Sequence, residues 1–248
     1  MTKSFERFNL DRVVYEVCGE CGCVHARTLL DLPEEQWRNI CHDYHGGYRA
    51  LDDNPDDPRW RKRLNAQAEV LLSLRASQLL PTNTEWLDFG CGDGDLLNLL
   101  NQGGLQVLGY DPYWHKAVYL SETELLPGRF PVVLNTATLE HLRDRESLDR
   151  VGSLVSPDGV LALHTLVRGE IPRDPDWFYL LPVHTLMFTN RAMSLLFEQW
   201  NFDCSLYAVE ARLWLWFRQP LLEELKRVVH EHESEDWQTS RGFLAYWP

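Results

Sequence analysis

Long apolar runs are absent from this sequence. No window of the 248 residues reaches the roughly 18 apolar positions that a membrane-spanning helix needs. The first residues, Met1 to Arg7, also lack the apolar core of a secretory signal peptide. We therefore expect a soluble, cytoplasmic protein with no membrane partner.

An excess of basic residues is missing as well. The chain carries 24 Lys and Arg against 37 Asp and Glu, a formal net charge of -13. A surface of this sign repels phosphate backbones and anionic lipid, so nucleic acid is not an expected partner. Repeats and low-complexity segments are absent too. The length suits one α/β domain with attachments, or two small domains.

The alternation of short apolar runs with helical stretches predicts βαβ units. The expected fold is a Rossmann-like, doubly wound α/β domain. Its seven-stranded, mostly parallel sheet has an antiparallel last strand and is preceded by a small Cys/His-rich segment. The predicted parts are a Cys/His-rich segment (1–55), a leading helix (56–82), the main domain (83–220) and a C-terminal extension (221–248). Strands are expected at 85–89, 105–110, 132–135, 160–166, 204–209 and 213–217, and helices at 64–80, 95–102, 147–155 and 190–200. The acidic, proline-bearing run 51–58 is typical of a linker or turn.

Three closely spaced glycines follow the first expected strand of the main domain. Gly90, Gly92 and Gly94 stand between an apolar run and a leucine-rich one. A strand, a glycine turn and a helix together form a nucleotide cradle, because glycine lets backbone N–H groups approach a ligand at the positive end of the helix. The spacing is G-x-G-x-G, which does not fit the dinucleotide fingerprint G-x-G-x-x-G. A nicotinamide oxidoreductase is therefore disfavoured.

Acidic residues around this loop restrict the class of ligand further. Asp88, Asp93 and Asp95 would repel a pyrophosphate but suit a cationic ligand. Asp111 follows the next expected strand, where an acid binds a ribose diol in nucleotide-binding α/β folds. S-adenosylmethionine has an adenosyl group, no pyrophosphate, a sulfonium and an ammonium, so it meets both conditions.

Five ordered motifs resemble the class I S-adenosylmethionine-dependent methyltransferases of small-molecule type. They are Leu87–Gly94, Gly109–Pro112, Thr138–Leu142, Leu154–Val160 and His184–Asn190, and they cover roughly residues 64–218. The resemblance implies a methyl transferase whose cofactor is S-adenosylmethionine.

The resemblance also implies the cofactor residues. Asp88, Gly90 and Gly92 are assigned to the methionine end, Asp111 to the ribose hydroxyls, and Tyr113 or Trp114 to the adenine. The full expected set is Asp88, Gly90, Cys91, Gly92, Asp111, Pro112, Tyr113, Asn135 and Glu140. Only about twenty residues separate Asp111 from Phe130, which is short for the family's helix and third strand. If 117–120 is that strand, Ser121 or Glu122 comes near the adenine edge.

The candidate catalytic side chains are His141, His184 and Tyr113. Methyl transfer from a sulfonium needs alignment of donor and acceptor more than acid catalysis, but an oxygen acceptor benefits from a base. Each histidine could instead hydrogen-bond a loop and only shape the wall. His164, within a strand, is better explained as a satisfied core residue.

Two further segments could border the acceptor. Residues 168–182 form a long loop whose aromatics, Trp177, Phe178 and Tyr179, either wall a pocket or pin the loop to the core, with Arg168 and Arg173 able to hold an anion. Tyr44, His45 and Tyr48 are expected to fold over the cleft as a lid.

A C-x-x-C-G turn lies near the beginning of the chain. Two thiolates at this spacing hold one zinc ion, and a structural site needs four ligands. The expected set is Cys18, Cys21, Cys23 and Cys41, with His25, His42 and His45 as other completions. Relatives of this type carry such a turn before a stretch like Leu32–Glu35, but residues 1–17 contain no second cysteine pair. A metal-free knuckle therefore stays an alternative to a structural zinc.

The leading hypothesis is a methyltransferase acting on O, N or C of a small acceptor, such as a sugar or natural product. The alternative is an inactive protein that binds S-adenosylmethionine or S-adenosylhomocysteine and captures a partner through its Cys/His segment. The residues do not indicate an oligomeric state.

Overall fold

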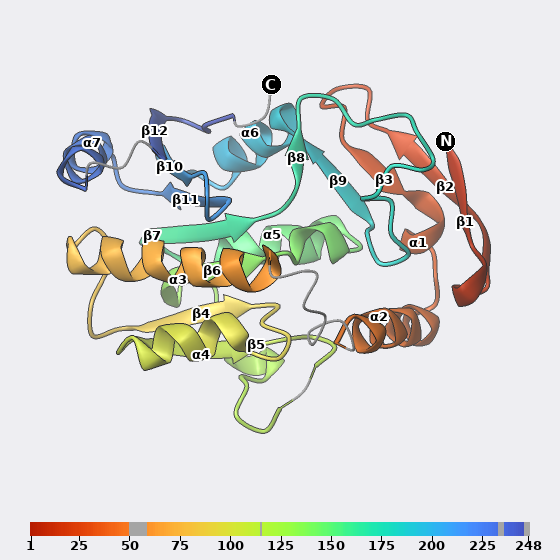
Figure 1. Cartoon of the computed structure of the whole chain (residues 1–248), viewed down its shortest axis with the longest axis horizontal. Helices are drawn as coiled ribbons and strands as arrows, with labels where there is room; N and C mark the ends of the chain where they lie inside the picture. The colour runs from red at the N-terminus through yellow and green to blue at the C-terminus, as the bar shows by residue number, and fades with distance from the viewer. Residues whose placement is uncertain (50–58, 115, 233–235, 246–248) are drawn as a thin grey trace.

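The computed structural model describes residues 1–49, 59–114, 116–232 and 236–245. The linker expected at 51–58 lies outside these residues. A large and a small β-sheet lie side by side, with the helices packed around them (Figure 1).

The large sheet has seven strands in the order β12-β10-β11-β7-β6-β4-β5. Strands β5, β4, β6 and β7 are parallel, whereas β11 and β12 run against the others. The bounds are β4 (Glu85–Phe89), β5 (Gln106–Tyr110), β6 (Phe130–Thr136), β7 (Val155–His164), β10 (Cys204–Ala208), β11 (Leu213–Phe217) and β12 (Trp237–Arg241). The predicted fold class is confirmed.

Helices cover both faces of this sheet, because its central strands are apolar on both sides. On one face pack α3 (Arg59–Ala76), α4 (Asp95–Gln102) and α7 (Leu222–Glu231). On the other pack α5 (Arg145–Leu154) and α6 (Asn190–Gln199). All five residues of β11 are buried between these layers.

The small sheet joins two distant parts of the chain. Its order is β1-β2-β3-β9-β8, with β1 (Thr2–Phe5), β2 (Leu10–Val17), β3 (Val24–Ala26), β8 (Val167–Arg168) and β9 (Leu186–Thr189). The N-terminal segment therefore pairs with the insertion that follows β7. After β3 come the short α1 (Arg27–Leu30) and then α2 (Glu34–Arg49), and Figure 1 shows α2 beside the end of the large sheet toward which β4 and β7 point.

One expectation about the sheet is wrong. Residues 117–120 form a turn, so no third family-type strand follows β5, which is the edge of the sheet. The seventh strand is β12, from the C-terminal residues that sequence patterns left unplaced. The short helix η2 (Glu122–Glu124) follows this turn, and the hydroxyl of Tyr110 donates a hydrogen bond to Glu122.

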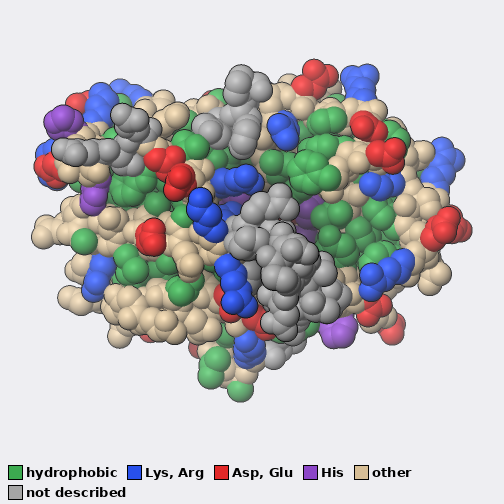
Figure 2. All heavy atoms as spheres, in the orientation of Figure 1, with side chains coloured by type: hydrophobic (Ala, Val, Ile, Leu, Met, Phe, Trp, Pro, Cys, Tyr) green, Lys and Arg blue, Asp and Glu red, His purple; other side chains and the backbone are tan. Residues whose placement is uncertain are grey.

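No helix among the described residues is long and apolar enough to cross a membrane. On the face shown in Figure 2, acidic and basic side chains are interspersed.

Candidate active site

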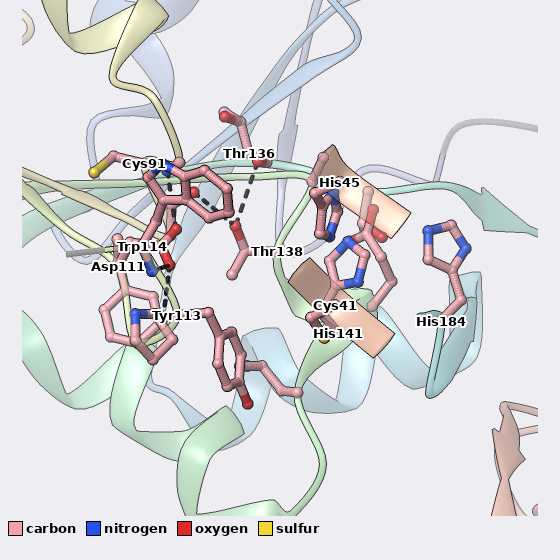
Figure 3. A pocket seen from close by; sticks show the side chains of 18 of the residues that line it. Cys41, His45, Cys91, Asp111, Tyr113, Trp114, Thr136, Thr138, His141 and His184 are labelled. Carbon is pink, nitrogen blue, oxygen red and sulfur yellow. Dashed lines mark hydrogen bonds between the residues drawn. The ribbon is translucent and has the colours of Figure 1, made fainter. Parts of the chain in front are cut away.

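A pocket of about 1140 Å³ opens at the carboxyl ends of β4, β5, β6 and β7. Ligands bind at this edge in open α/β sheets. The opposite wall comes from α2 and from the insertion between β8 and β9, so both sheets contribute to one cavity. Figure 3 shows two groups of side chains that line the pocket. Asp111, Tyr113 and Trp114 lie on one side of Thr138, and His45, His141 and His184 lie on the other.

The glycine loop after β4 adopts left-handed backbone geometry, with φ of 80° at Gly90 and 53° at Gly92. The N–H groups of Gly90 and Cys91 donate to the carbonyl of Tyr110 at 2.7 and 3.1 Å, which fixes the loop against the end of β5. A Cβ at Gly90 would lie 2.3 Å from Oγ1 of Thr138, whereas nothing lies within 4 Å of one at Gly92. The protein itself therefore approaches Gly90, and the open space for a ligand is at Gly92.

The carboxylate of Asp111 organises the second loop. One oxygen accepts from the backbone N–H of Gly92 at 2.9 Å, and the other from those of Tyr113 and Trp114 at 2.9 and 2.8 Å. These bonds connect the loops after β4 and β5 through one side chain, and Asp111 lines the pocket.

Asp88 lies buried at the base of the glycine loop, 2% exposed. Burial, and then the neighbouring charge of Asp111, raise the pKa of this carboxyl to about 7. A cationic ligand beside it would stabilise the ionised form, because opposite charge lowers a carboxyl pKa.

These two loops, at the ends of adjacent parallel strands, lie within a region that matches a known family model. The model is described as a methyltransferase domain and matches residues 59–206, more than half of the chain. The chain belongs to the methyltransferase domain family. The predicted class I S-adenosylmethionine-dependent methyltransferase is thereby confirmed. No curated protein matches the chain.

Solved structures with a similar fold are distant in sequence. A SAM-dependent methyltransferase from Archaeoglobus fulgidus is 19% identical, with a TM-score of 0.40 over 56% of this chain and 72% of that one. The 1,6-didemethyltoxoflavin-N1-methyltransferase of Burkholderia thailandensis, solved with 1,6-didemethyltoxoflavin and S-adenosylhomocysteine, is 16% identical, with a TM-score of 0.48 over 82% and 96%. Similarities of this size do not identify an acceptor.

Most of the predicted cofactor residues of the methyltransferase line the pocket. They are Asp88, Gly90, Cys91, Gly92, Asp111, Pro112, Tyr113 and Glu140. Asn135 is the exception. It is fully buried in β6, where its Nδ2 donates to the carbonyl of Phe89 at 3.2 Å, so it braces the sheet below the site.

Both predicted histidines reach the cavity from different elements. His141 ends the short helix η3 (Leu139–His141) after β6, and His184 precedes β9; their ring centroids are 5.0 Å apart. His45 of α2 lies against His141 at 5.3 Å, as the expected lid implies. Burial lowers the pKa of His141 to about 4 and that of His184 well below its usual value, so both rings are neutral at pH 7. A base works best with a pKa near the working pH, so neither ring is well tuned for that role.

Tyr113 is a poor candidate base as well. Its hydroxyl accepts a hydrogen bond from the indole of Trp37 at 2.9 Å, and burial raises its pKa to about 12. The contact instead fastens α2 to the loop after β5. Trp114 lies in the same loop and its ring stacks on His42 of α2, with centroids 5.7 Å apart.

The aromatic residues of the insertion after β8 lie in two places, the core of the small sheet and the wall of the pocket. Trp177 is buried in the core of the small sheet, which agrees with the pinning alternative. Phe178 and Tyr179 line the pocket, and the Tyr179 hydroxyl donates to Glu140 at 2.9 Å. Arg168 and Arg173 are not among the pocket-lining residues.

The cysteine knuckle forms the turn between β2 and β3. Among the described residues, the sulfurs of Cys18, Cys21 and Cys23 lie within 4.8 Å of one another. Cys41 is not in this group. It is buried on α2 and lines the pocket, because the helix carries it away from the turn. His25 pairs with Glu16 at 3.0 Å, and so also lies outside the group.

Sequence reasoning missed the residues that attach the N-terminal segment of the methyltransferase to its catalytic domain. Arg143 donates to the carbonyls of Leu30, at 2.9 Å, and Leu32, and pairs with Glu34 at 3.0 Å. Its place directly after the Thr138–Leu142 motif was the one available signal. The side chain of Tyr48, one of the expected lid residues, is outside the described part of the structure.

Proposed function

We propose that this methyltransferase binds S-adenosylmethionine with the loops after β4 and β5 and transfers its methyl group to a small-molecule acceptor. The observation that carries the proposal is the single pocket of about 1140 Å³ lined both by Asp88, Gly92 and Asp111 and by α2 and the insertion. Pockets for one drug-sized ligand measure about 300–1,000 Å³. This cavity therefore has room for a cofactor and an acceptor together.

The two groups of side chains on either side of Thr138 suggest how the pocket is divided. The cofactor takes the side of Asp111 and Trp114, and the acceptor takes the side of the histidines. Aromatic residues Phe178 and Tyr179 suit a flat or sugar-like acceptor with O, N or C as the methylated atom. Transfer then depends on holding the two in line and excluding water.

The test is a transfer assay. The protein is incubated with S-adenosylmethionine and a panel of hydroxylated, aminated and sugar-like acceptors, and products are detected by mass together with S-adenosylhomocysteine. Cofactor binding without transfer to any acceptor would support the alternative hypothesis of an inactive binding protein. Lack of cofactor binding would overturn the proposal.

The raised pKa of Asp88 predicts pH-dependent cofactor binding. Below about pH 7 this carboxyl is protonated in the free protein, and it must lose its proton to stabilise the bound cation. Affinity for S-adenosylmethionine should therefore fall roughly tenfold from pH 8 to pH 6. Calorimetry at several pH values measures this, and Asp88→Asn should give a flat profile. A flat profile in the unmodified protein would contradict the assignment.

We also propose that the knuckle holds a structural zinc ion, with its three sulfurs as ligands and the fourth position filled from outside the knuckle. Three sulfurs converge. Hydrogen bonds from the backbone N–H groups of Cys21 and Glu20 lower the pKa of Cys18, which favours its thiolate, whereas burial raises the pKa of Cys23. The side chain of Thr189 donates to the carbonyl of Cys21, so the turn is connected to β9. Elemental analysis should show that Cys18→Ser reduces the zinc content by one ion per chain and lowers the melting temperature. An unchanged zinc content would mean a metal-free knuckle.

A further inference from the structure

A second group of metal-ligand side chains lies inside the pocket. Ligand atoms of Glu140, His141 and His184 are within 4.8 Å of one another. Glu140 and His184 are 3% and 6% exposed, so the group is largely removed from water. Figure 3 shows His141 and His184 together on the side of the cavity away from Asp111. None of the sequence motifs indicated that these three would converge as ligands.

Each histidine directs one ring nitrogen, Nδ1, to a backbone carbonyl. Nδ1 of His141 lies 2.8 Å from the carbonyl of Val183, and Nδ1 of His184 lies 2.9 Å from that of Tyr179. A carbonyl only accepts, so each Nδ1 carries the proton and each Nε2 presents a lone pair. Metal-ligating histidines show the same arrangement, in which a backbone carbonyl fixes the tautomer and the ring orientation.

Glu140 supplies a buried oxygen without a close hydrogen bond. One carboxylate oxygen accepts from the Tyr179 hydroxyl at 2.9 Å, while the other is buried and makes no close hydrogen bond among the described residues, with the hydroxyl of Thr165 as its neighbouring donor. The backbone of Glu140 is fixed as well, because the N–H and the hydroxyl of Thr185 both donate to its carbonyl, at 2.7 and 3.0 Å. A buried polar atom left without a partner costs about 1–3 kcal/mol. A bound cation would satisfy this oxygen.

We propose that Glu140, His141 and His184 bind one divalent first-row transition-metal ion, such as zinc. Two neutral imidazoles and one carboxylate are a set typical of zinc and of non-haem iron, whereas magnesium and calcium prefer oxygen ligands. Ligands about 2.1 Å from a common ion lie at most about 4.2 Å apart. Small side-chain movements close the group on an ion.

The simpler alternative is a proton on Glu140. A protonated carboxyl has one proton, so it could donate to only one of the two Nε2 atoms and would leave the other without a donor. A cation satisfies all three atoms at once. The two hypotheses are distinguished by measuring metal binding, because only the metal site predicts that the protein binds an ion.

The ion would face the acceptor side of the pocket. Three protein ligands leave coordination positions open, and an oxygen or nitrogen atom of the acceptor can take one of them. This consequence for the acceptor rests on the proposed function, whereas binding of the ion does not.

Metal binding is tested on the full chain without cofactor or acceptor. The background is the triple variant C18S/C21S/C23S, which removes the knuckle, after treatment with a chelator. Zinc is titrated by calorimetry and cobalt by visible absorption. We expect one ion per chain and a cobalt spectrum without a thiolate charge-transfer band.

Two variants in this background identify the ligands, and one serves as the control. Glu140→Gln, which can keep the hydrogen bond from Tyr179, and His184→Ala should each weaken zinc binding at least about 100-fold. His25→Ala removes a histidine outside the group and should change nothing. Melting temperatures show whether the variants are folded. If His184→Ala does not fold, Glu140→Gln is the decisive variant.

Unchanged affinity in Glu140→Gln, or no binding in the background protein, would overturn the proposal. Calorimetry with S-adenosylhomocysteine on the same samples reports the proposed cofactor site separately. Loss of metal binding with intact cofactor binding, or the reverse, therefore shows which of the two proposals fails.

Discussion

Asp111→Ala should weaken S-adenosylhomocysteine binding by about 100-fold or more. After its three backbone hydrogen bonds the carboxylate has one acceptor position left for the ribose diol, and a hydrogen bond to a charged group contributes about 1.5–3 kcal/mol. It also accepts from Gly92, Tyr113 and Trp114 in the free protein, so its loss loosens both loops that border the cofactor. Isothermal titration calorimetry measures the change directly.

Asp111→Asn is the matched comparison. It preserves the size of the side chain and one acceptor oxygen but removes the charge, so we expect an affinity between those of the unmodified protein and Asp111→Ala. Melting temperatures separate a loss of affinity from a loss of folding. Full-strength binding by a folded Asp111→Ala protein would disprove the assignment of this residue to the ribose.

Gly90→Ala should be the most destabilising change in the glycine loop, lowering the free energy of unfolding by about 3 kcal/mol. A Cβ there would lie 2.3 Å from Oγ1 and 2.4 Å from Cγ2 of Thr138, and the backbone φ of 80° is unfavourable for any side chain. Urea unfolding measures the effect. The substitution should also displace Thr138 and deform the pocket.

Gly92→Ala is the control within the same loop. It shares a positive φ, but nothing lies within 4 Å of the added carbon, so it should cost only about 1–2 kcal/mol of backbone strain. Thr138→Ala should recover part of the loss in Gly90→Ala and none of the loss in Gly92→Ala. Equal stability of the two glycine variants would refute the contact with Thr138.

Local patterns were sufficient for several elements around the large sheet. Strands β4 and β11 and helix α4 begin and end at the predicted residues, because apolar periodicity and flanking glycines act within a few positions along the chain. The loop at Gly90 and the acid at Asp111 were recognisable for the same reason. Their ligand was inferred from spacing and charge alone.

Pairing between distant segments was not predictable in this way. Strands β8 and β9, on either side of the expected loop 168–182, were not predicted; β9 pairs with β3 and β8 pairs with β9. Strand β12 is polar by sequence and acquires its place by pairing with β10. Residues 117–120 form a turn, so the strand considered there does not pair with the free edge of β5.

The loops proposed to bind the cofactor were therefore predictable from the sequence, since their residues follow adjacent strands whose carboxyl ends must meet. The sequence also named Glu140, His141 and His184 as candidates, but only the tertiary structure shows how their side chains converge. Glu140, His141 and His184 converge because the insertion after β8 folds back on η3, and Arg143 holds the N-terminal segment against them. Such contacts depend on packing between segments 40 or more residues apart, and this packing cannot be predicted from a local sequence pattern.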